Sequence, residues 1–100
     1  FNRKKPAEIA DREDERLEAA RLAPSAVNSQ PWYFVHSGNT IHTYCMDRFF
    51  RKQFLGDMNK MDVGISLAHI YIENEDRFRY FTVENPPAEK GYLYIGSFEI

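Results

Sequence analysis

Residues 23–32 read Ala-Pro-Ser-Ala-Val-Asn-Ser-Gln-Pro-Trp, and this stretch separates two kinds of secondary structure. Pro24 disfavours the helical conformation at Ala23, so a helix that arrives from the N-terminal side ends there. A polar loop follows over 25–31. The aromatic and β-branched residues over 32–35 then favour a strand. The stretch therefore predicts a passage from helix through loop to strand.

A tight hairpin follows at once. Gly38-Asn39 stands between the run 32–35 and a second strand-like run over 40–44. Both residue types tolerate a positive φ, which the common two-residue hairpin turns require. We therefore expect two antiparallel strands joined by a two-residue turn.

The rest of the chain adds helices and strands on either side of this hairpin. Residues 7–22 favour helix after Pro6, although the charged cluster 11–16 could divide it into two short helices. A short helix over 48–55 is expected to end at Gly56, with Asn59 as the N-cap of the next. That helix, 61–72, is apolar around almost its whole circumference, which predicts burial on most sides. Alternating patterns predict strands over 77–83 and 92–100.

This order of elements predicts an α+β fold in which an antiparallel sheet packs on a central buried helix. The length suits one small domain spanning residues 1–100.

Composition restricts the functional classes. The chain has 13 basic and 15 acidic residues and a net charge of −2, which argues against a nucleic-acid binder. No apolar run is long enough to span a membrane. Cys45 is the only cysteine. It can form no intrachain disulfide, which fits a reducing compartment and makes the cytoplasm the expected location.

Most catalytic patterns are missing from the sequence. There is no phosphate-binding glycine loop and no CxxC pair. His36 and His42 fall on facing hairpin strands and could lie near each other, but they lack metal-ligand spacing, so no metal site is expected. No serine has an evident paired base, so a serine hydrolase has no support, and we assign no catalytic side chain.

The loop 23–32 is the one stretch that suits a ligand. Its side chains Ser25, Asn28, Ser29 and Gln30 are neutral donors and acceptors, suited to the edge of a planar heterocycle. On the residues alone, a structural turn remains the commoner explanation of such a loop.

The run 21–34, Arg-Leu-Ala-Pro-Ser-Ala-Val-Asn-Ser-Gln-Pro-Trp-Tyr-Phe, resembles the helix-to-strand signature of the nitroreductase superfamily. Residues 61–69, Met-Asp-Val-Gly-Ile-Ser-Leu-Ala-His, and 91–98, Gly-Tyr-Leu-Tyr-Ile-Gly-Ser-Phe, are similar to the buried helix and the C-terminal strand of its TM subfamily. The resemblance covers roughly residues 16–100.

The resemblance implies a homodimer or pseudo-dimer that holds FMN at its interface, takes hydride from NAD(P)H and reduces a small nitro or quinone acceptor. Pro24 and Ser25 would abut the isoalloxazine. Ala26, Asn28 and Gln30 would follow along the ring edge or the fold that supports it, and Trp32 would brace the loop. Family chains are about twice this length, in line with usual domain sizes, so the resemblance also implies the C-terminal half of a longer protein. The alternative is a non-catalytic scaffold or dimerisation half-domain that does not hold flavin alone.

Overall fold

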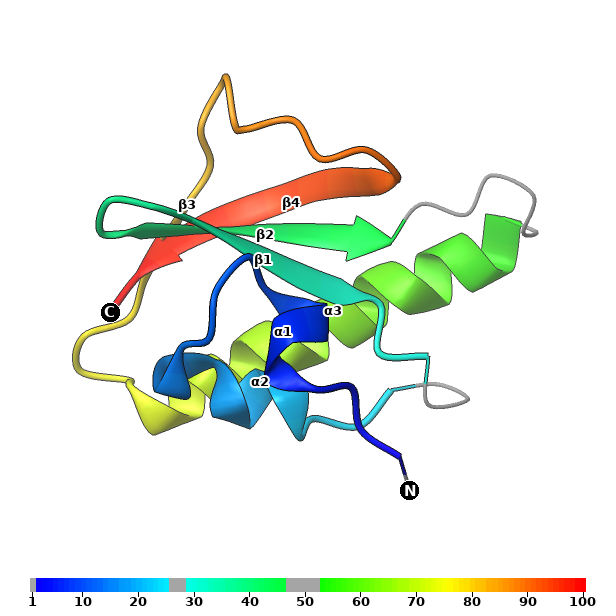
Figure 1. Cartoon of the computed structure of the whole chain (residues 1–100), viewed down its shortest axis with the longest axis horizontal. Coiled ribbons are helices and arrows are strands. Elements are labelled where there is room, and N and C mark those ends of the chain that lie inside the picture. Colours follow the sequence, from blue (N-terminus) through cyan, green and yellow to red (C-terminus); the bar gives the residue numbers. More distant parts are fainter. Residues whose placement is uncertain (1, 26–28, 47–52) are drawn as a thin grey trace.

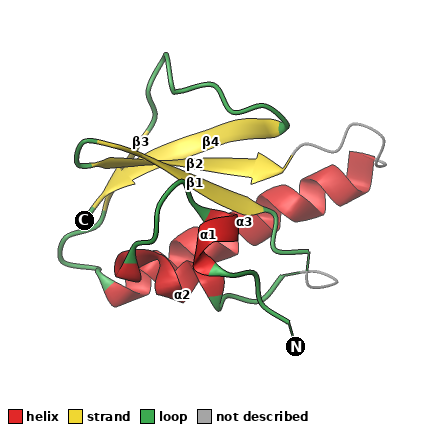
Figure 2. Cartoon of the chain, in the orientation of Figure 1, coloured by secondary structure: helices red, strands yellow, loops and turns green. Residues whose placement is uncertain are grey.

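The computed structural model describes residues 2–25, 29–46 and 53–100, the backbone alone for 53–58. Along the chain follow α1 (Pro6–Ile9), the 3-10 helix η1 (Glu15–Leu17), α2 (Glu18–Arg21), β1 (Trp32–Ser37), β2 (Thr40–Met46), α3 (Gln53–Glu73), β3 (Arg79–Phe81) and β4 (Tyr92–Glu99). Figure 1 shows the helices gathered on one side of the sheet, with the loop between β3 and β4 on the other side. Figure 2 separates the two layers by colour and confirms the predicted α+β class.

The sheet has the strand order β1-β2-β4-β3, and every neighbouring pair is antiparallel. The predicted hairpin is confirmed: β1 and β2 are joined at Gly38, which has φ +60, and Asn39. The register pairs Val35 with His42 and His36 with Ile41. Because cross-strand partners share a face and neighbours along a strand alternate, the two histidines lie on opposite faces and form no pair.

The core lies between the sheet and the helices. Phe34, Ile41 and Phe98 of the sheet are almost fully buried there, together with Val63 and Ile70 of α3. The Phe98 ring meets the Phe34 ring edge-on at 6.2 Å between centroids and stacks on Phe78 at 5.2 Å. Phe98 therefore links β4 with β1 and with the residue before β3 at the centre of the core.

Helix α3 contradicts two predictions made from the sequence. It is continuous from Gln53, so Gly56 does not end a helix and Asn59 does not cap one. Gly in a helix interior costs only about 1 kcal/mol relative to Ala, which packing along a long helix outweighs. Burial on most sides is also wrong, because Met61 and Ile72 on the other side of the helix are exposed. The first part of the predicted helix 48–55 lies outside the described residues.

The division of the N-terminal helix within 11–16 is confirmed, and β1 accounts for it. The Asp11 N–H donates to the Phe34 carbonyl (3.0 Å), and the Asp11 and Asp14 carboxylates face the two ring nitrogens of His36 at 2.6 and 2.8 Å. Hydrogen bonds from Arg16 and then from His36 hold the pKa of Asp14 well below its usual range. These contacts bind the segment between α1 and η1 to the edge of the sheet.

Candidate functional site

The loop 23–32 lies at one end of the helical layer, between α2 and β1. Of the predicted cofactor-binding residues, Pro24 is exposed, Ser25 is half-buried and Gln30 is buried. Ala26 and Asn28 lie outside the described residues. Trp32 is buried, as expected for a residue that braces the loop from the core, and its indole Nε1 has no hydrogen-bond partner among the described residues.

Gln30 joins the loop to the N-terminal segment. Its Oε1 accepts a hydrogen bond from the Lys4 backbone N–H at 2.7 Å, and its Nε2 donates to the Asn2 carbonyl at 3.0 Å. The residue is 3% exposed and has a φ of +46. Both ends of its amide are thus engaged by backbone groups, so in this structure Gln30 supports the loop.

Further bonds fix the loop itself. The Ser25 Oγ accepts from the Gln30 N–H at 3.0 Å, which closes the loop on itself. The Met46 N–H donates to the Pro31 carbonyl at 2.8 Å and ties the loop to the end of β2. The Ser29 Oγ donates to the Asn59 Oδ1 on α3 at 3.4 Å. A loop anchored at several points can hold a ligand with little loss of conformational entropy on binding.

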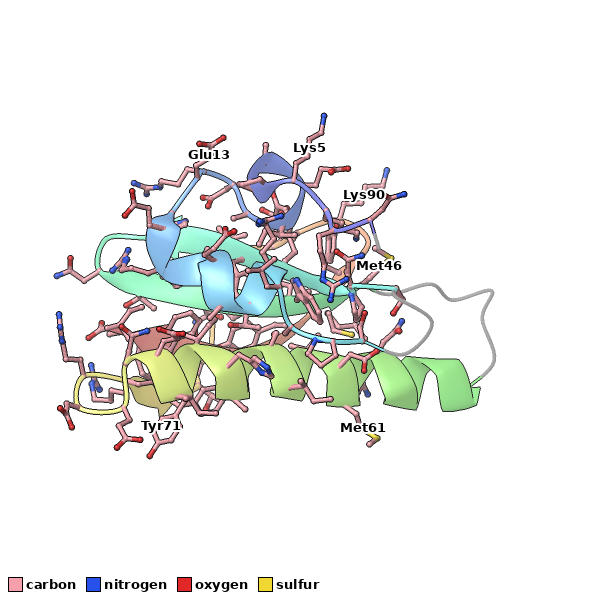
Figure 3. The ribbon with its side chains drawn as sticks, turned by 90° about the horizontal axis from the view of Figure 1, so that it is seen from below. Lys5, Glu13, Met46, Met61, Tyr71 and Lys90 are labelled. Carbon is pink, nitrogen blue, oxygen red and sulfur yellow. The ribbon has the colours of Figure 1, made fainter. Side chains whose placement is uncertain are left out.

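The backbone segment that Gln30 holds beside this loop carries basic residues. Arg3, Lys4 and Lys5 are consecutive in the segment that Gln30 holds, and the Arg21 guanidinium donates to the Lys4 carbonyl at 3.3 Å. Lys5 lies on this segment, on the side of the molecule away from α3 (Figure 3). The contact between the N-terminal segment and Gln30 could not be predicted from the sequence. Residues 4 and 30 are far apart in the chain, and the positive φ of Gln30 has no local sequence signal. Neutral polar and basic residue types in two neighbouring segments suit a ligand with a neutral planar part and an anionic part.

A second polar cluster, also unforeseen, lies on the sheet face away from the helices. The His42 Nδ1 lies 2.8 Å from the Ser97 Oγ, which lies 2.6 Å from the Tyr94 hydroxyl. The Val83 N–H donates to that hydroxyl at 3.1 Å, and the Tyr44 hydroxyl donates to the Pro87 carbonyl. Ser97 is fully buried, so it cannot meet a substrate as a nucleophile. The cluster holds the β3–β4 loop on the sheet.

Burial lowers the pKa of His42 below its usual value, because the charged ring is poorly solvated there. The unfolded chain therefore binds a proton at this histidine more readily than the folded chain does. Its contribution to stability is complete above the unfolded pKa of about 6.5 and is lost below it, as the pH falls through the lower pKa of the folded chain.

We expect the His42→Asn variant to lose less stability than the parent chain between pH 7.5 and pH 5. Asn keeps a polar group near Ser97 but does not titrate, so the pH slopes of the two chains differ by the His42 contribution. Urea denaturation at both pH values measures the difference. Parallel slopes would show that His42 is freely protonated in the folded state.

No group of three or more His, Cys, Asp or Glu side chains forms a metal-ion site within residues 2–25, 29–46 and 59–100. No helix in the described part of the chain is both long and apolar enough to cross a membrane.

A family model described as "Putative TM nitroreductase" matches residues 1–74. The match includes the N-terminal basic segment, the loop 23–32, the hairpin and α3, and it stops before β3. No curated protein and no solved structure gives a significant match.

Proposed function

Because the chain belongs to the TM nitroreductase family, we propose that it forms part of an FMN-dependent NAD(P)H oxidoreductase that reduces a small nitro compound or quinone. The observation that carries the proposal is the contact between the loop 23–32 and the basic segment 3–5, through the Gln30 amide. In this proposal, the ring side and the phosphate side of a flavin mononucleotide site come from segments that lie next to each other.

The residues present fit FMN by their chemistry. Pro24 and the loop residues after it offer a neutral polar edge to the isoalloxazine ring. The side chains of Arg3, Lys4 and Lys5 offer cations to the phosphate, which binds cations by charge-assisted hydrogen bonds. When bound, the flavin supplies the transfer of hydride and electrons, and the protein supplies binding and orientation.

The chain's own residues then have distinct tasks. Gln30 keeps the basic segment against the loop, and Ser25 fixes the path of the loop by accepting the Gln30 N–H. Among the described residues at the loop we assign no general acid or base. In the proposed reaction the chemistry belongs to the cofactor, and the residues of the loop bind and support it.

The second candidate function is a scaffold half-domain that keeps the fold and its contacts without holding flavin alone. It is favoured by the engagement of the Ser25 hydroxyl and the Gln30 amide within the chain, which leaves these groups less able to contact a ligand. In that case the first function belongs to an assembly of which this chain is one part.

Titration with FMN and with riboflavin distinguishes the two functions, because the two ligands differ only in the phosphate. Quenching of flavin fluorescence should show FMN binding to the purified chain, more tightly than riboflavin. The double variant Lys4→Gln/Lys5→Gln should weaken FMN binding by about tenfold, as expected for the loss of two partly solvated charge contacts. Riboflavin binding should stay unchanged.

The matched control is Lys60→Gln/Lys90→Gln, which removes the same charge from positions on α3 and next to β4. It should leave both affinities as they were. Absence of quenching by either ligand would support the scaffold. Equal loss of FMN affinity in both double variants would mean that net charge, not the segment 3–5, attracts the phosphate.

A further inference from the structure

Four polar groups form a continuous hydrogen-bonded chain on the face of the sheet away from the helices. The His42 Nδ1 lies 2.8 Å from the Ser97 Oγ, and that oxygen lies 2.6 Å from the Tyr94 hydroxyl. The Val83 N–H donates to the same hydroxyl at 3.1 Å. His42 and Ser97 are buried, and Tyr94 and Val83 are half-buried. The chain of bonds thus runs from β2 across β4 to the first residues of the β3–β4 loop, which spans 82–91.

The direction of these bonds is determined at the Val83 end. A backbone N–H can only donate, so the Tyr94 oxygen accepts there. The Tyr94 hydroxyl can then donate to Ser97, and the Ser97 hydroxyl to the His42 Nδ1. Tyr94 has no further hydrogen-bond partner among the described residues, so this direction is the one that uses its proton. The network therefore assigns Nδ1 of His42 as the acceptor and Nε2 as the protonated nitrogen.

Protonation of His42 conflicts with this direction. The ring gains its proton at Nδ1, the atom that accepts from Ser97, so both atoms of that contact would then carry a proton. The Ser97 hydroxyl must turn toward Tyr94, to which the Val83 N–H already donates. The Tyr94 proton then has no partner within the chain of bonds. In a largely buried cluster an unpaired donor is costly, so the charged ring weakens the whole chain.

The same bonds hold the β3–β4 loop against the sheet. Figure 1 shows this loop on the side opposite to the helices, and most of its residues are exposed. It is tied to the sheet by the bond from the Val83 N–H to Tyr94 and by the bond from the Tyr44 hydroxyl to the Pro87 carbonyl. A mostly exposed loop belongs to the parts of a protein that open locally without global unfolding. Loss of the Val83 bond therefore favours detachment of the loop while the sheet stays intact.

The other ionisable groups near His42 leave it as the group that responds to pH. Burial is the cause that lowers the pKa of His42. On β2, burial raises the pKa of the Tyr44 phenol. On β4, hydrogen bonds from Thr40 and Arg79 lower the pKa of Glu99. The remaining titratable side chains on this face or on the loop are Tyr33, Tyr92, Tyr94, Glu84, Glu89 and Lys90. Histidine is the side chain whose charge ordinarily changes between pH 5 and pH 8, and here it is the terminal acceptor of the chain of bonds.

We propose that His42 is a proton-sensitive latch for the β3–β4 loop: the neutral ring holds the loop on the sheet through Ser97 and Tyr94, and protonation releases it. The sign follows from the burial of the ring. Release uncovers His42 to water, where the charged ring is well solvated, so protons stabilise the released state. The equilibrium constant for release should rise by up to about tenfold for each pH unit below about 6.5. The latch lies on the sheet face opposite to the helices, and it does not depend on flavin binding.

Amide hydrogen exchange, resolved at each residue by NMR, measures the release directly through the Val83 N–H. Between pH 6.5 and pH 5 the protection factor of this amide should fall by about tenfold, whereas the paired amides of β1 and β2 keep theirs. The protection factor already corrects for the pH dependence of exchange in an unstructured chain. Constant protection of Val83 over this range overturns the proposal. So does an equal loss of protection in β1 and β2, which would report global unfolding.

Two variants separate the latch from general destabilisation. His42→Asn places a side chain there that does not titrate, so protection of Val83 should no longer depend on pH. Tyr94→Phe removes the hydroxyl between Ser97 and Val83, and it should lower the protection of Val83 by about tenfold at pH 7.5 as well. Circular dichroism confirms that each variant is folded. A Val83 amide that keeps its pH dependence in His42→Asn contradicts the proposal.

Tyr80→Phe is the matched control for the loss of a phenolic hydroxyl. Tyr80 pairs with Phe98 and so lies on the other face of the sheet, where its hydroxyl donates to the Ile95 carbonyl at 3.3 Å. Val83 should keep both its protection at pH 7.5 and its pH dependence in this variant. An effect equal to that of Tyr94→Phe would mean that any lost hydroxyl loosens the loop, which contradicts the latch.

The tautomer of His42 supplies a test that needs no variant. Nitrogen chemical shifts of the imidazole ring distinguish a protonated ring nitrogen from one that carries only a lone pair. At pH 7.5 the Nδ1 should carry the lone pair and the Nε2 the proton, as the direction of the bonds requires. A protonated Nδ1 at pH 7.5 would mean that the neutral ring already donates to Ser97, and it overturns the proposal.

Discussion

Replacement of Phe98 by Ala should lower the free energy of unfolding by about 3–5 kcal/mol, the usual range for a fully buried phenylalanine. The ring is fully buried and contacts Phe34 on β1 and Phe78 before β3, so its removal leaves a cavity between β1, β4 and the start of β3. A domain of this size has a total stability of about 5–15 kcal/mol. The variant should therefore unfold at a much lower urea concentration, as followed by circular dichroism.

Phe81→Ala is the matched control, because it removes the same side chain from β3 at the edge of the sheet. Phe81 is half-buried, and the Arg79 guanidinium lies 4.8 Å from its ring centroid. We expect a loss of about 1 kcal/mol there, since a partly solvated ring leaves no closed cavity. Equal losses in the two variants would contradict the placement of Phe98 at the centre of the core.

The parts of the fold that sequence predicted are those with local causes. The hairpin depends on the conformational freedom of Gly38 and Asn39. These two residues form the turn themselves, so the sequence around the turn is enough to predict it. The alternating side-chain patterns predict the strands 77–83 and 92–100. The first strand, β3, is shorter than predicted, because it pairs with β4 only over Arg79–Phe81. Helix α3 was divided wrongly because Gly56 and Asn59 carry local signals that packing along the whole helix overrides.

Burial of α3 shows a different limit of sequence reasoning. Its apolar residues cover both sides, and the pattern alone cannot tell which side meets the sheet and which side is exposed. The candidate site likewise depends on a contact between distant parts of the chain. The loop 23–32 was recognisable from its residues, but its neighbour, the basic segment 3–5, depends on a single buried amide distant in sequence.

The second prediction concerns the side-chain amide of Gln30. Gln30→Glu preserves size and shape but replaces the donor Nε2 by a carboxylate oxygen, which then faces the Asn2 carbonyl oxygen. The bond from the Lys4 N–H can persist, whereas the contact with Asn2 becomes repulsive. We expect a loss of about 2–3 kcal/mol in stability, the penalty for burying an unsatisfied charged group. FMN affinity should fall by about tenfold or more, because the basic segment is no longer held beside the loop.

A shift in pH separates this cause from general damage to the fold. Burial raises the pKa of a carboxyl group, and the protonated acid can again donate to the Asn2 carbonyl while accepting from Lys4. The stability deficit of Gln30→Glu relative to the parent chain should therefore shrink as the pH is lowered from 7.5 towards 5. Gln30→Gly removes both side-chain bonds but tolerates the φ of +46, so its deficit should not depend on pH. A Gln30→Glu variant with unchanged stability and FMN affinity would mean that the Gln30 amide does not hold the two halves of the site together.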